Sequence, residues 1–458
     1  MKRPLRLAWA SPLPPSSSGI ADYSAELLPI LAERSEVTLF HDDREGPRVA
    51  AEIATRFPCR SLATLGPESS GEFDLVLYQI GNSAPHHATI FRKALAVPGV
   101  VVLHETMLHH LVREMTLARG DSRGYVDAMR YATGRSGELA AQRLLDTHFP
   151  VDVWSFPLFE QLVDRSLGVI VHSEFARQRV LASRPLAEVH RIPMGVAVVD
   201  PGVDPEEERA TVRQRLGIDG DEFVVASFGF VTPQKRLEPA LAAFARLRRD
   251  RQRCRFVVVG EVSPHYDFAE VLARHEADGV TVLGRVPAAA FSDWMQACDL
   301  AVNLRHPTGG ETSASLLRLL ALGRPTVVNS TGAFTEVPEG AVIQLPLDGY
   351  EEATLSEIFV RVAGSPDLAR AIGAAARAFV AAGHTLRASV DGYLAACGRL
   401  LATPMVPLEP CPPLLAWPAD DPWPALLAAV GAEVADLGIG ESDEEALREI
   451  AARLAELR

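Results

Sequence analysis

The stretch VNLRHPTGGETSASLLRLLALGRPTVVNSTGAFTEVP, residues 302–338, decides the fold of this chain. An apolar run ends in a short polar loop up to Gly310, and an amphipathic helix over 312–322 follows. The helix stops at Gly323, and the strand 325–329 leads into a second glycine-bearing loop. The pattern predicts a strand–loop–helix–strand unit with small polar residues where parallel sheets bind ligands. The free N–H groups of a helix start there suit a phosphate.

The same alternation of strands and helices runs along the rest of the chain. Short β-branched apolar runs predict strands at 5–10, 37–42, 73–81, 99–105, 167–175, 223–229, 255–260, 280–283, 299–303 and 325–329. Helical stretches are expected at 20–34, 176–181, 236–249, 267–277, 288–297, 312–322, 366–382 and 441–458. Within the last of these, Ser442 and Glu445 resemble a capping box. Such alternation is typical of parallel sheets with crossover helices.

The alternation restarts after residue 195, which predicts two α/β domains of similar size. The fold class expected is α/β, with two Rossmann-like, doubly wound parallel-sheet domains and a C-terminal helical appendage. The linker is the Pro-, Gly- and acid-rich stretch 191–208. The expected domains are 1–195 with a helical insertion at about 106–165, then 196–395, then a Pro-rich segment and helices at 396–458.

Composition limits the partners and the location. The 458 residues include 45 Lys and Arg against 59 Asp and Glu, a formal net charge of −14. This balance argues against nucleic acid as a partner, because phosphate binding needs clustered basic charge. Five cysteines without metal-type spacing indicate reduced thiols in a cytoplasmic protein. We expect no signal peptide and no membrane span, while peripheral membrane contact stays open.

Six motifs follow one another in a fixed order: SSSGIADYS, VIVHSEFAR, RIPMGV, SFGFVTPQKR, VTVLGRVP and the stretch 302–338. Together with the two α/β domains they resemble GT-B glycosyltransferases, close to the retaining family-4 group (glycosyl transferases group 1), over roughly residues 5–395. The resemblance implies an acceptor-side first domain and a nucleotide-sugar-binding second domain that face a cleft. It also implies a retaining transfer of a sugar from a nucleoside-diphosphate sugar to an acceptor hydroxyl, in glycan or polysaccharide biosynthesis. A glycan, a lipid-linked glycan or a protein would be the acceptor, and no cofactor is expected.

The motif SFGFVTPQKR places Gly229 at a strand end, where backbone can approach a ligand closely. Lys235 and Arg236 follow near the start of the next helix, where cations oppose the helix dipole, so a neighbouring anion would explain them. The resemblance implies that Lys235 binds the donor diphosphate. The family usually has a basic residue directly after the glycine, but Phe230 stands there, and Arg236 is the substitute we expect. A solvated surface pair is the alternative for both cations.

The motif TGGETSASLLRLLALGRP departs further from the family pattern. That pattern has two glutamates separated by seven residues, of which the second contacts the nucleotide ribose. With a one-residue shift the first falls on Glu311, whereas the second falls on Arg318, which can only donate hydrogen bonds and so suits phosphate. A salt-bridged helix residue is the alternative for Arg318, and an ordinary N-cap is the alternative for the hydroxyls. The expected donor-binding residues of this motif are Glu311, Thr312, Ser313, Ala314, Ser315 and Arg318.

Polar residues also follow the strands of the N-terminal half. Gly19 lies in the loop after the first strand, which in the family approaches the transferred sugar and phosphates; a plain turn glycine is the alternative. His104 precedes Glu105 at a strand end, and the resemblance places a histidine there near the donor sugar; a structural histidine is the alternative. His109 and His110 lie on the next helix, but an i to i+5 spacing from His104 does not align on one helical face, so no metal site is expected.

Two more strand ends carry polar groups. Ser173 and Glu174 follow the strand of VIVHSEFAR, with Arg177 one turn further. Gly332 and Glu336 lie on the loop after the strand 325–329. The resemblance places a glycine-rich loop and a glutamate there near the donor, and a helix N-terminal acid is the alternative for Glu336.

The expected catalytic residues are His104, Lys235 and Glu311. Lys235 and the N–H groups near Thr312 would stabilise the leaving diphosphate, whose own oxygen could take the acceptor proton, so no carboxylate base is required. Two alternatives are left open: a sugar-nucleotide epimerase, which would use acidic residues and water instead of an acceptor, and a catalytically silent nucleotide-sugar-binding scaffold. The departures at Phe230 and Arg318 motivate the scaffold. A dinucleotide-dependent oxidoreductase fits worse, because no GxGxxG follows the first strand.

Overall fold

The structure of the chain is a computed structural model. It describes residues 3–42, 49–66, 69, 71–198, 204–275, 278–402, 430–431, 434 and 443–456. The chain divides into two compact units, Met1–Pro407 and Leu408–Arg458. In the described part of the second unit, Glu444–Glu456 form helix α18. The capping box expected at Ser442 and Glu445 lies outside the side chains that the structure describes.

The first sheet, as far as residues 3–198 are described, has seven parallel strands in the order β3-β2-β1-β4-β5-β6-β7. The strand order reverses between β1 and β4, which is the kind of switch point where open α/β sheets bind ligands. The strands are β1 (Leu5–Ala10), β2 (Ser35–His41), β3 (Cys59–Ser61), β4 (Leu75–Ile80), β5 (Val100–Leu103), β6 (Gly168–Val171) and β7 (Val189–Arg191).

The second sheet, within the described residues 204–402, has six parallel strands in the order β10-β9-β8-β11-β12-β13. Its order reverses between β8 and β11. The strands are β8 (Phe223–Phe228), β9 (Cys254–Val259), β10 (Val280–Gly284), β11 (Leu300–Asn303), β12 (Thr326–Asn329) and β13 (Ile343–Leu345).

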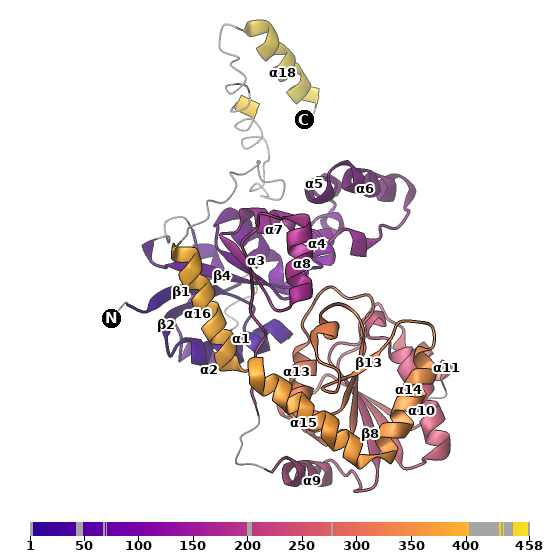
Figure 1. The fold of residues 1–458 in the computed structure, drawn as a ribbon. Coiled ribbons are helices and arrows are strands. Elements are labelled where there is room, and N and C mark those ends of the chain that lie inside the picture. The colour runs from indigo at the N-terminus through magenta and orange to yellow at the C-terminus, as the bar shows by residue number, and fades with distance from the viewer. Residues whose placement is uncertain are drawn as a thin grey trace. The chain divides into compact units, whose positions relative to one another are not determined.

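Helices cover both faces of each sheet (Figure 1). The first sheet is accompanied by α1 (Gly19–Leu31), α2 (Ala51–Ala54), α3 (Ala84–Ala96), α4 (His109–Met115), α5 (Ser122–Thr133), α6 (Arg135–Thr147), α7 (Glu160–Arg165), α8 (Glu174–Ser183) and the short 3-10 helices η1 (Leu62–Thr64), η3 (Leu117–Arg119) and η4 (Val153–Ser155). The second half contains α9 (Pro205–Arg215), α10 (Leu237–Asp250), α11 (Phe268–Arg274), α12 (Ala288–Ala297), α13 (Ala314–Ala321), α14 (Glu351–Gly364), α15 (Pro366–Gly383), α16 (Leu386–Ala402), η5 (Pro233–Lys235) and η6 (Gly332–Glu336). Within the described residues, no helix has the length and apolar content to cross a membrane.

The expected fold class is therefore confirmed: the chain has two Rossmann-like, doubly wound domains. Strands such as β5, β8 and β11 are buried along their whole length, because helices cover both faces of the sheet, and they read as continuous apolar runs. The helix expected at 312–322 begins two residues later, at Ala314, because Ser313 serves as its N-cap.

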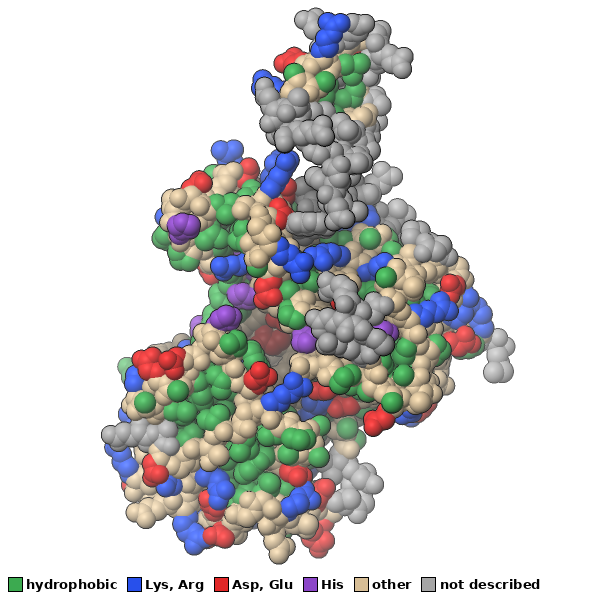
Figure 2. Space-filling view, turned by 180° about the vertical axis from the view of Figure 1, so that it is seen from behind, with side chains coloured by type: hydrophobic (Ala, Val, Ile, Leu, Met, Phe, Trp, Pro, Cys, Tyr) green, Lys and Arg blue, Asp and Glu red, His purple; other side chains and the backbone are tan. Residues whose placement is uncertain are grey.

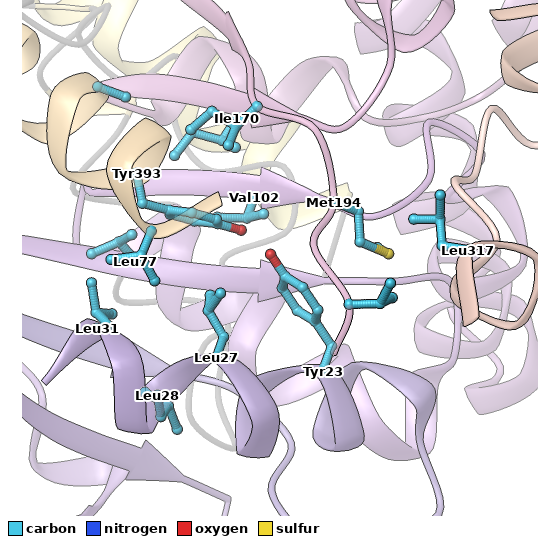
Figure 3. Close-up of a cluster of buried hydrophobic side chains, with 14 of the residues drawn as sticks. Tyr23, Leu27, Leu28, Leu31, Leu77, Val102, Ile170, Met194, Leu317 and Tyr393 are labelled. Atoms are coloured by element: carbon cyan, nitrogen blue, oxygen red, sulfur yellow. The ribbon is translucent and has the colours of Figure 1, made fainter. Parts of the chain in front are cut away.

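A buried cluster joins the first sheet to helix α16, which comes after the second sheet in the chain (Figure 3). Tyr393 of α16 lies against Trp9 of β1, with ring centroids 5.8 Å apart. Tyr23 of α1 points toward Tyr393 in the same cluster. Ser389 of α16 donates its hydroxyl to the carbonyl of Pro193 at 2.6 Å. Helix α16, the last described helix of the first compact unit, thus packs against the first strand and the first helix of the chain.

Candidate functional site

Loops at the carboxyl ends of the two sheets meet. Thr106, just after β5, donates both its N–H and its hydroxyl to the carbonyl of Gly309, each at 2.8 Å. A β-carbon on Gly310 would lie 2.7 Å from the Thr106 hydroxyl, so the loop after β11 needs glycine for this approach. Figure 2 shows a hollow between the two domains with acidic and histidine side chains along it. The loops after β5 and β11 therefore border one junction.

Lys235 is the last residue of η5, and its buried side chain reaches back to the end of β8. The residue is 7% exposed, and its ammonium group donates to the carbonyl of Phe228. A β-carbon on Gly229, whose φ is 90°, would lie 3.0 Å from Nζ. Burial, and next the charge of Arg305, hold the pKa of Lys235 well below its ordinary value, while Glu311 acts in the opposite direction. An anion entering this site would restore the charged ammonium.

Glu311 is held by two groups of its own loop. Arg305 Nε lies 2.9 Å from Glu311 Oε1, and the Thr308 hydroxyl donates to Oε2 at 2.9 Å. The backbone N–H of Arg305 donates in turn to Oδ1 of the fully buried Asn329 at 2.9 Å. Because Arg305 and Glu311 both act on Lys235, the structure brings together the two catalytic residues expected in the second domain.

The start of α13 is fixed by hydroxyl groups. The Ser313 hydroxyl accepts the Leu316 N–H at 3.2 Å, which confirms the N-cap interpretation of this serine. Asn303 Nδ2 donates to Ser313 at 3.2 Å and to Ser315 at 3.3 Å. Thr312 and Ala314 flank the cap. The first N–H groups of a helix have no partners within it, and the anion binding expected at this end stays a prediction.

Two arginines expected to bind the donor are paired with carboxylates. Arg236 pairs with Glu351 at the start of α14, with Nε 3.1 Å from Oε1. Arg318 donates to Glu26 of α1 at 2.6 Å, a salt bridge between the two domains. The salt-bridged alternative is therefore confirmed for Arg318. Phe230 stands 51% exposed in the place of the family's basic residue.

His104 is a buried and neutral histidine of the first domain. Its Nε2 lies 2.8 Å from Gln79 Oε1, an acceptor, so Nε2 carries the proton. The ring packs against His172, with centroids 4.9 Å apart, and against Tyr23. Burial, and then His172, hold the pKa of His104 well below its ordinary value. These contacts suit the structural alternative, and the catalytic role stays a prediction.

The remaining N-terminal candidates have distinct surroundings. Gly19 is the first residue of α1, and in the described chain no atom comes within 4 Å of a β-carbon placed on it. His109 is structural, because Nδ1 donates to the Phe156 carbonyl at 2.7 Å and Nε2 accepts from the Tyr125 hydroxyl at 2.9 Å. No group of three or more His, Cys, Asp or Glu among the described residues is placed to hold a metal ion.

Glu336 caps a helix of the other domain. Its carboxylate accepts the Glu174 N–H at 2.9 Å and the Phe175 N–H at 2.7 Å, at the start of α8. Ser173 completes the cap by accepting the Ala176 N–H at 3.1 Å. Glu336 is thus a helix N-terminal acid, as the alternative interpretation held, but for α8 rather than for a helix of its own domain.

Replacing Glu336 by alanine should lower the free energy of unfolding by about 1 kcal/mol, because two N–H groups of α8 lose a charged acceptor. Urea denaturation of the purified chain measures the change. Glu339→Ala is the matched control, since Glu339 is an exposed acid of the same segment. Equal effects of the two substitutions would show that the cap contributes nothing to stability.

Three residues of the junction were given no role by the sequence. Glu105 accepts the Asn82 N–H on Oε1 at 3.0 Å, and its other oxygen lies beside Gly309. Arg305 contacts Glu311, and Glu26 contacts Arg318. Arg305 follows closely on β11, so its position at a strand end was a usable signal. The roles of Glu105 and Glu26 depend on the opposite domain, which no local pattern records.

Part of the second domain matches a known protein family. Residues 222–383 match the family model described as Glycosyl transferases group 1. D-inositol 3-phosphate glycosyltransferase of Segniliparus rotundus is 29% identical over 212 residues, which are 44% of this chain and 46% of that protein. The chain spans about half the length of the curated relatives it matches.

Solved structures share the fold over most of the chain. Sucrose-phosphate synthase (tll1590) of Thermosynechococcus elongatus superposes with a TM-score of 0.62 at 16% identity, over 87% of this chain and 99% of that one. Anabaena Alr3699/HepE, solved in complex with UDP and glucose, gives 0.57 at 16% identity over 86% of this chain and 100% of that one. The expected resemblance is thereby confirmed: residues 222–383 match the model of the glycosyl transferases group 1 family, and the chain has the GT-B fold.

Proposed function

We propose that the chain is a retaining glycosyltransferase that moves a sugar from a nucleoside-diphosphate sugar to an acceptor hydroxyl. The observation that carries this proposal is the buried Lys235 beside Gly229, close to Glu311 and Arg305. A desolvated ammonium at a strand end is costly to the fold unless an anion joins it. The group 1 family match over the same domain supports the proposal.

In the proposed reaction the second domain stabilises the leaving diphosphate. Lys235 and the N–H groups at the start of α13 supply positive charge, and each such preorganised donor is typically worth about 10²–10³ in rate. The departing phosphate oxygen takes the proton of the acceptor hydroxyl, so no additional base is needed. Closing the two domains over the donor would exclude water, and the contact between Thr106 and Gly309 already joins the two sides.

The anion site at Lys235 and the start of α13 also bears on the class of donor. Anabaena Alr3699/HepE was solved with UDP and glucose, and one relative is named a glycosyltransferase of D-inositol 3-phosphate. A nucleoside-diphosphate hexose is therefore our proposed donor. A glycan, lipid-linked or protein acceptor, peripheral membrane contact and metal-independent chemistry stay predictions. The described cysteines are free thiols, which supports the proposed cytoplasmic location.

A thermal-shift screen against UDP, GDP and their hexose conjugates tests the donor site. A nucleoside diphosphate at about 100 times its Kd should stabilise the chain by about 2.7 kcal/mol, because it binds only the folded state. Adenosine, which lacks the diphosphate, is the control ligand and should give no shift. The absence of a shift with every diphosphate would contradict the proposed function.

A catalytically silent nucleotide-sugar-binding scaffold is the second candidate. The observations that favour it are the exposed Phe230 at the family's basic position and the pairing of Arg318 with Glu26. Calorimetry with UDP and GDP, followed by turnover assays with acceptors, separates the two candidates. Binding without turnover over a wide acceptor panel would favour the scaffold.

A further inference from the structure

Two carboxylates from different domains flank one glycine at the junction. A β-carbon on Gly309 would lie 3.3 Å from Glu105 Oε2 and 3.3 Å from Glu311 Oε2. Gly309 is itself held, because its carbonyl accepts two hydrogen bonds from Thr106 at 2.8 Å each. The two acids therefore stay close to each other as long as the two domains are in contact.

Of the two acids, Glu311 is paired with a positively charged side chain, whereas Glu105 accepts a hydrogen bond from a neutral donor. Arg305 lies 2.9 Å from Glu311, which also accepts the Thr308 hydroxyl. Glu105 accepts a neutral backbone N–H, that of Asn82, at 3.0 Å. Two like charges this close, with a guanidinium paired to only one of them, favour a neutral form of the other acid.

The proton of this pair belongs on Glu105. Burial, and next the charge of Glu311, raise the pKa of Glu105 to about 8, although the Asn82 N–H and Arg305 lower it. Since Oε1 accepts the Asn82 N–H, the proton resides on Oε2, the oxygen beside Gly309. At neutral pH the Glu105 carboxyl is thus a neutral hydrogen-bond donor beside Glu311, which is paired with Arg305.

We propose that Glu105 is a positioning residue: its neutral carboxyl leaves Glu311 paired with Arg305, next to the anion site of Lys235. This inference rests on the proposed function and deepens it, because it says how the acceptor-side domain controls the donor side. An ionised Glu105 would compete with Glu311 for Arg305. It would also add a negative charge where the donor diphosphate is proposed to bind.

The inference predicts how binding depends on pH. Among the described residues, the charged groups that act on Glu105 are Glu311 and Arg305 from the loop after β11, and both also act on Lys235. The neighbouring His104 is neutral throughout, because its pKa lies well below the ordinary value. Glu105 is neutral below its raised pKa of about 8, so its contribution is present at lower pH and is lost as the pH rises through that value. Lys235 also loses charge with rising pH, so a variant has to separate the two groups.

Glu105→Gln separates them, because the amide stays neutral and still donates a hydrogen bond. Calorimetry should show that the Kd of the wild-type chain for UDP or GDP weakens about tenfold between about pH 7 and about pH 9, beyond any change due to Lys235. In Glu105→Gln that tenfold component should be absent. Glu52→Gln, an exposed acid on α2, is the matched control and should follow the wild type. Parallel pH curves for the wild type and Glu105→Gln would overturn the inference.

Infrared difference spectroscopy gives a readout that needs neither ligand nor turnover. The wild type should show the carbonyl band of a protonated carboxyl that titrates near pH 8, and Glu105→Gln should lack it. If neither UDP nor GDP binds, the proposed function fails, while the infrared band still tests Glu105. A spectrum without that band, or one that keeps it in Glu105→Gln, would refute the protonated state on which the inference depends.

Discussion

Replacing Lys235 by methionine should lower kcat/KM on the order of 10²–10³-fold with a competent donor and acceptor. The loss follows from the geometry at the end of β8. The ammonium is the buried end of a 7% exposed side chain, and Gly229 leaves room beside it. Methionine keeps most of the volume of the lysine stem but removes the charge that would meet the diphosphate. Steady-state kinetics measures the loss, and a thermal shift with UDP or GDP should shrink in parallel.

Lys93→Met is the matched control for this experiment. Lys93 is also partly buried and donates to the Leu65 carbonyl at 2.6 Å, but it lies on α3, away from the loops at the junction. Its replacement should leave kcat/KM per folded molecule close to the wild-type value. Near-wild-type turnover of Lys235→Met would remove Lys235 from the proposed mechanism, and an equal loss in both variants would indicate a general effect on folding.

Replacing Tyr393 by alanine should lower the free energy of unfolding by about 3–5 kcal/mol, the cost typical of a buried large aromatic. Tyr393 is 1% exposed and packs against Trp9 and Tyr23 in the cluster of Figure 3. Its loss leaves a cavity at the place where α16 docks on the first sheet. Urea denaturation followed by tryptophan fluorescence measures the effect, since Trp9 lies in the same cluster.

The control for Tyr393 is a tyrosine on the surface. Tyr350 precedes α14 and is 72% exposed, so Tyr350→Ala should change the free energy of unfolding by less than about 0.5 kcal/mol. A cost for Tyr393→Ala no larger than that of Tyr350→Ala would mean that α16 is not an integral part of the fold.

Most strands were predicted from the sequence, and those that were missed have a common physical character. β3, β7 and β13 are three residues long and lie at the edges of the sheets. An edge strand is covered less than a central one, so it needs no long apolar run. The central strands β5, β8 and β11 are buried on both faces, and their apolar runs made them visible.

The site was predictable where its residues follow strands of one sheet. Gly229, Lys235 and Glu311 follow strands of the same sheet, so their proximity follows from the topology. The chain also has only three lysines, Lys2, Lys93 and Lys235, among its 45 basic residues. Because nearly all other basic residues are arginines, a lysine soon after a predicted strand indicates a position where lysine is specifically required.

Charged partners that lie far apart in the sequence were not predictable. The pairing of Arg318 with Glu26 joins residues far apart in sequence, and the pair Glu105 and Glu311 does the same. Arg236 was expected at a donor, yet it pairs with Glu351 within its own domain. In each case the sequence shows a charge, but only the packing of helices and loops shows which opposite or like charge meets it.

The return of α16 to the first sheet means that the backbone crosses the junction twice. The two crossings are tied to each other, since the Val196 N–H donates to the His384 carbonyl at 2.9 Å and His384 Nδ1 lies 3.0 Å from the Met194 carbonyl. Two chain crossings held together in this way form the place where we expect a hinge between the domains. We therefore expect the two domains to open and close about this single hinge. Pairs of spin labels, one label on each domain, would measure this motion as correlated changes in the distances between them.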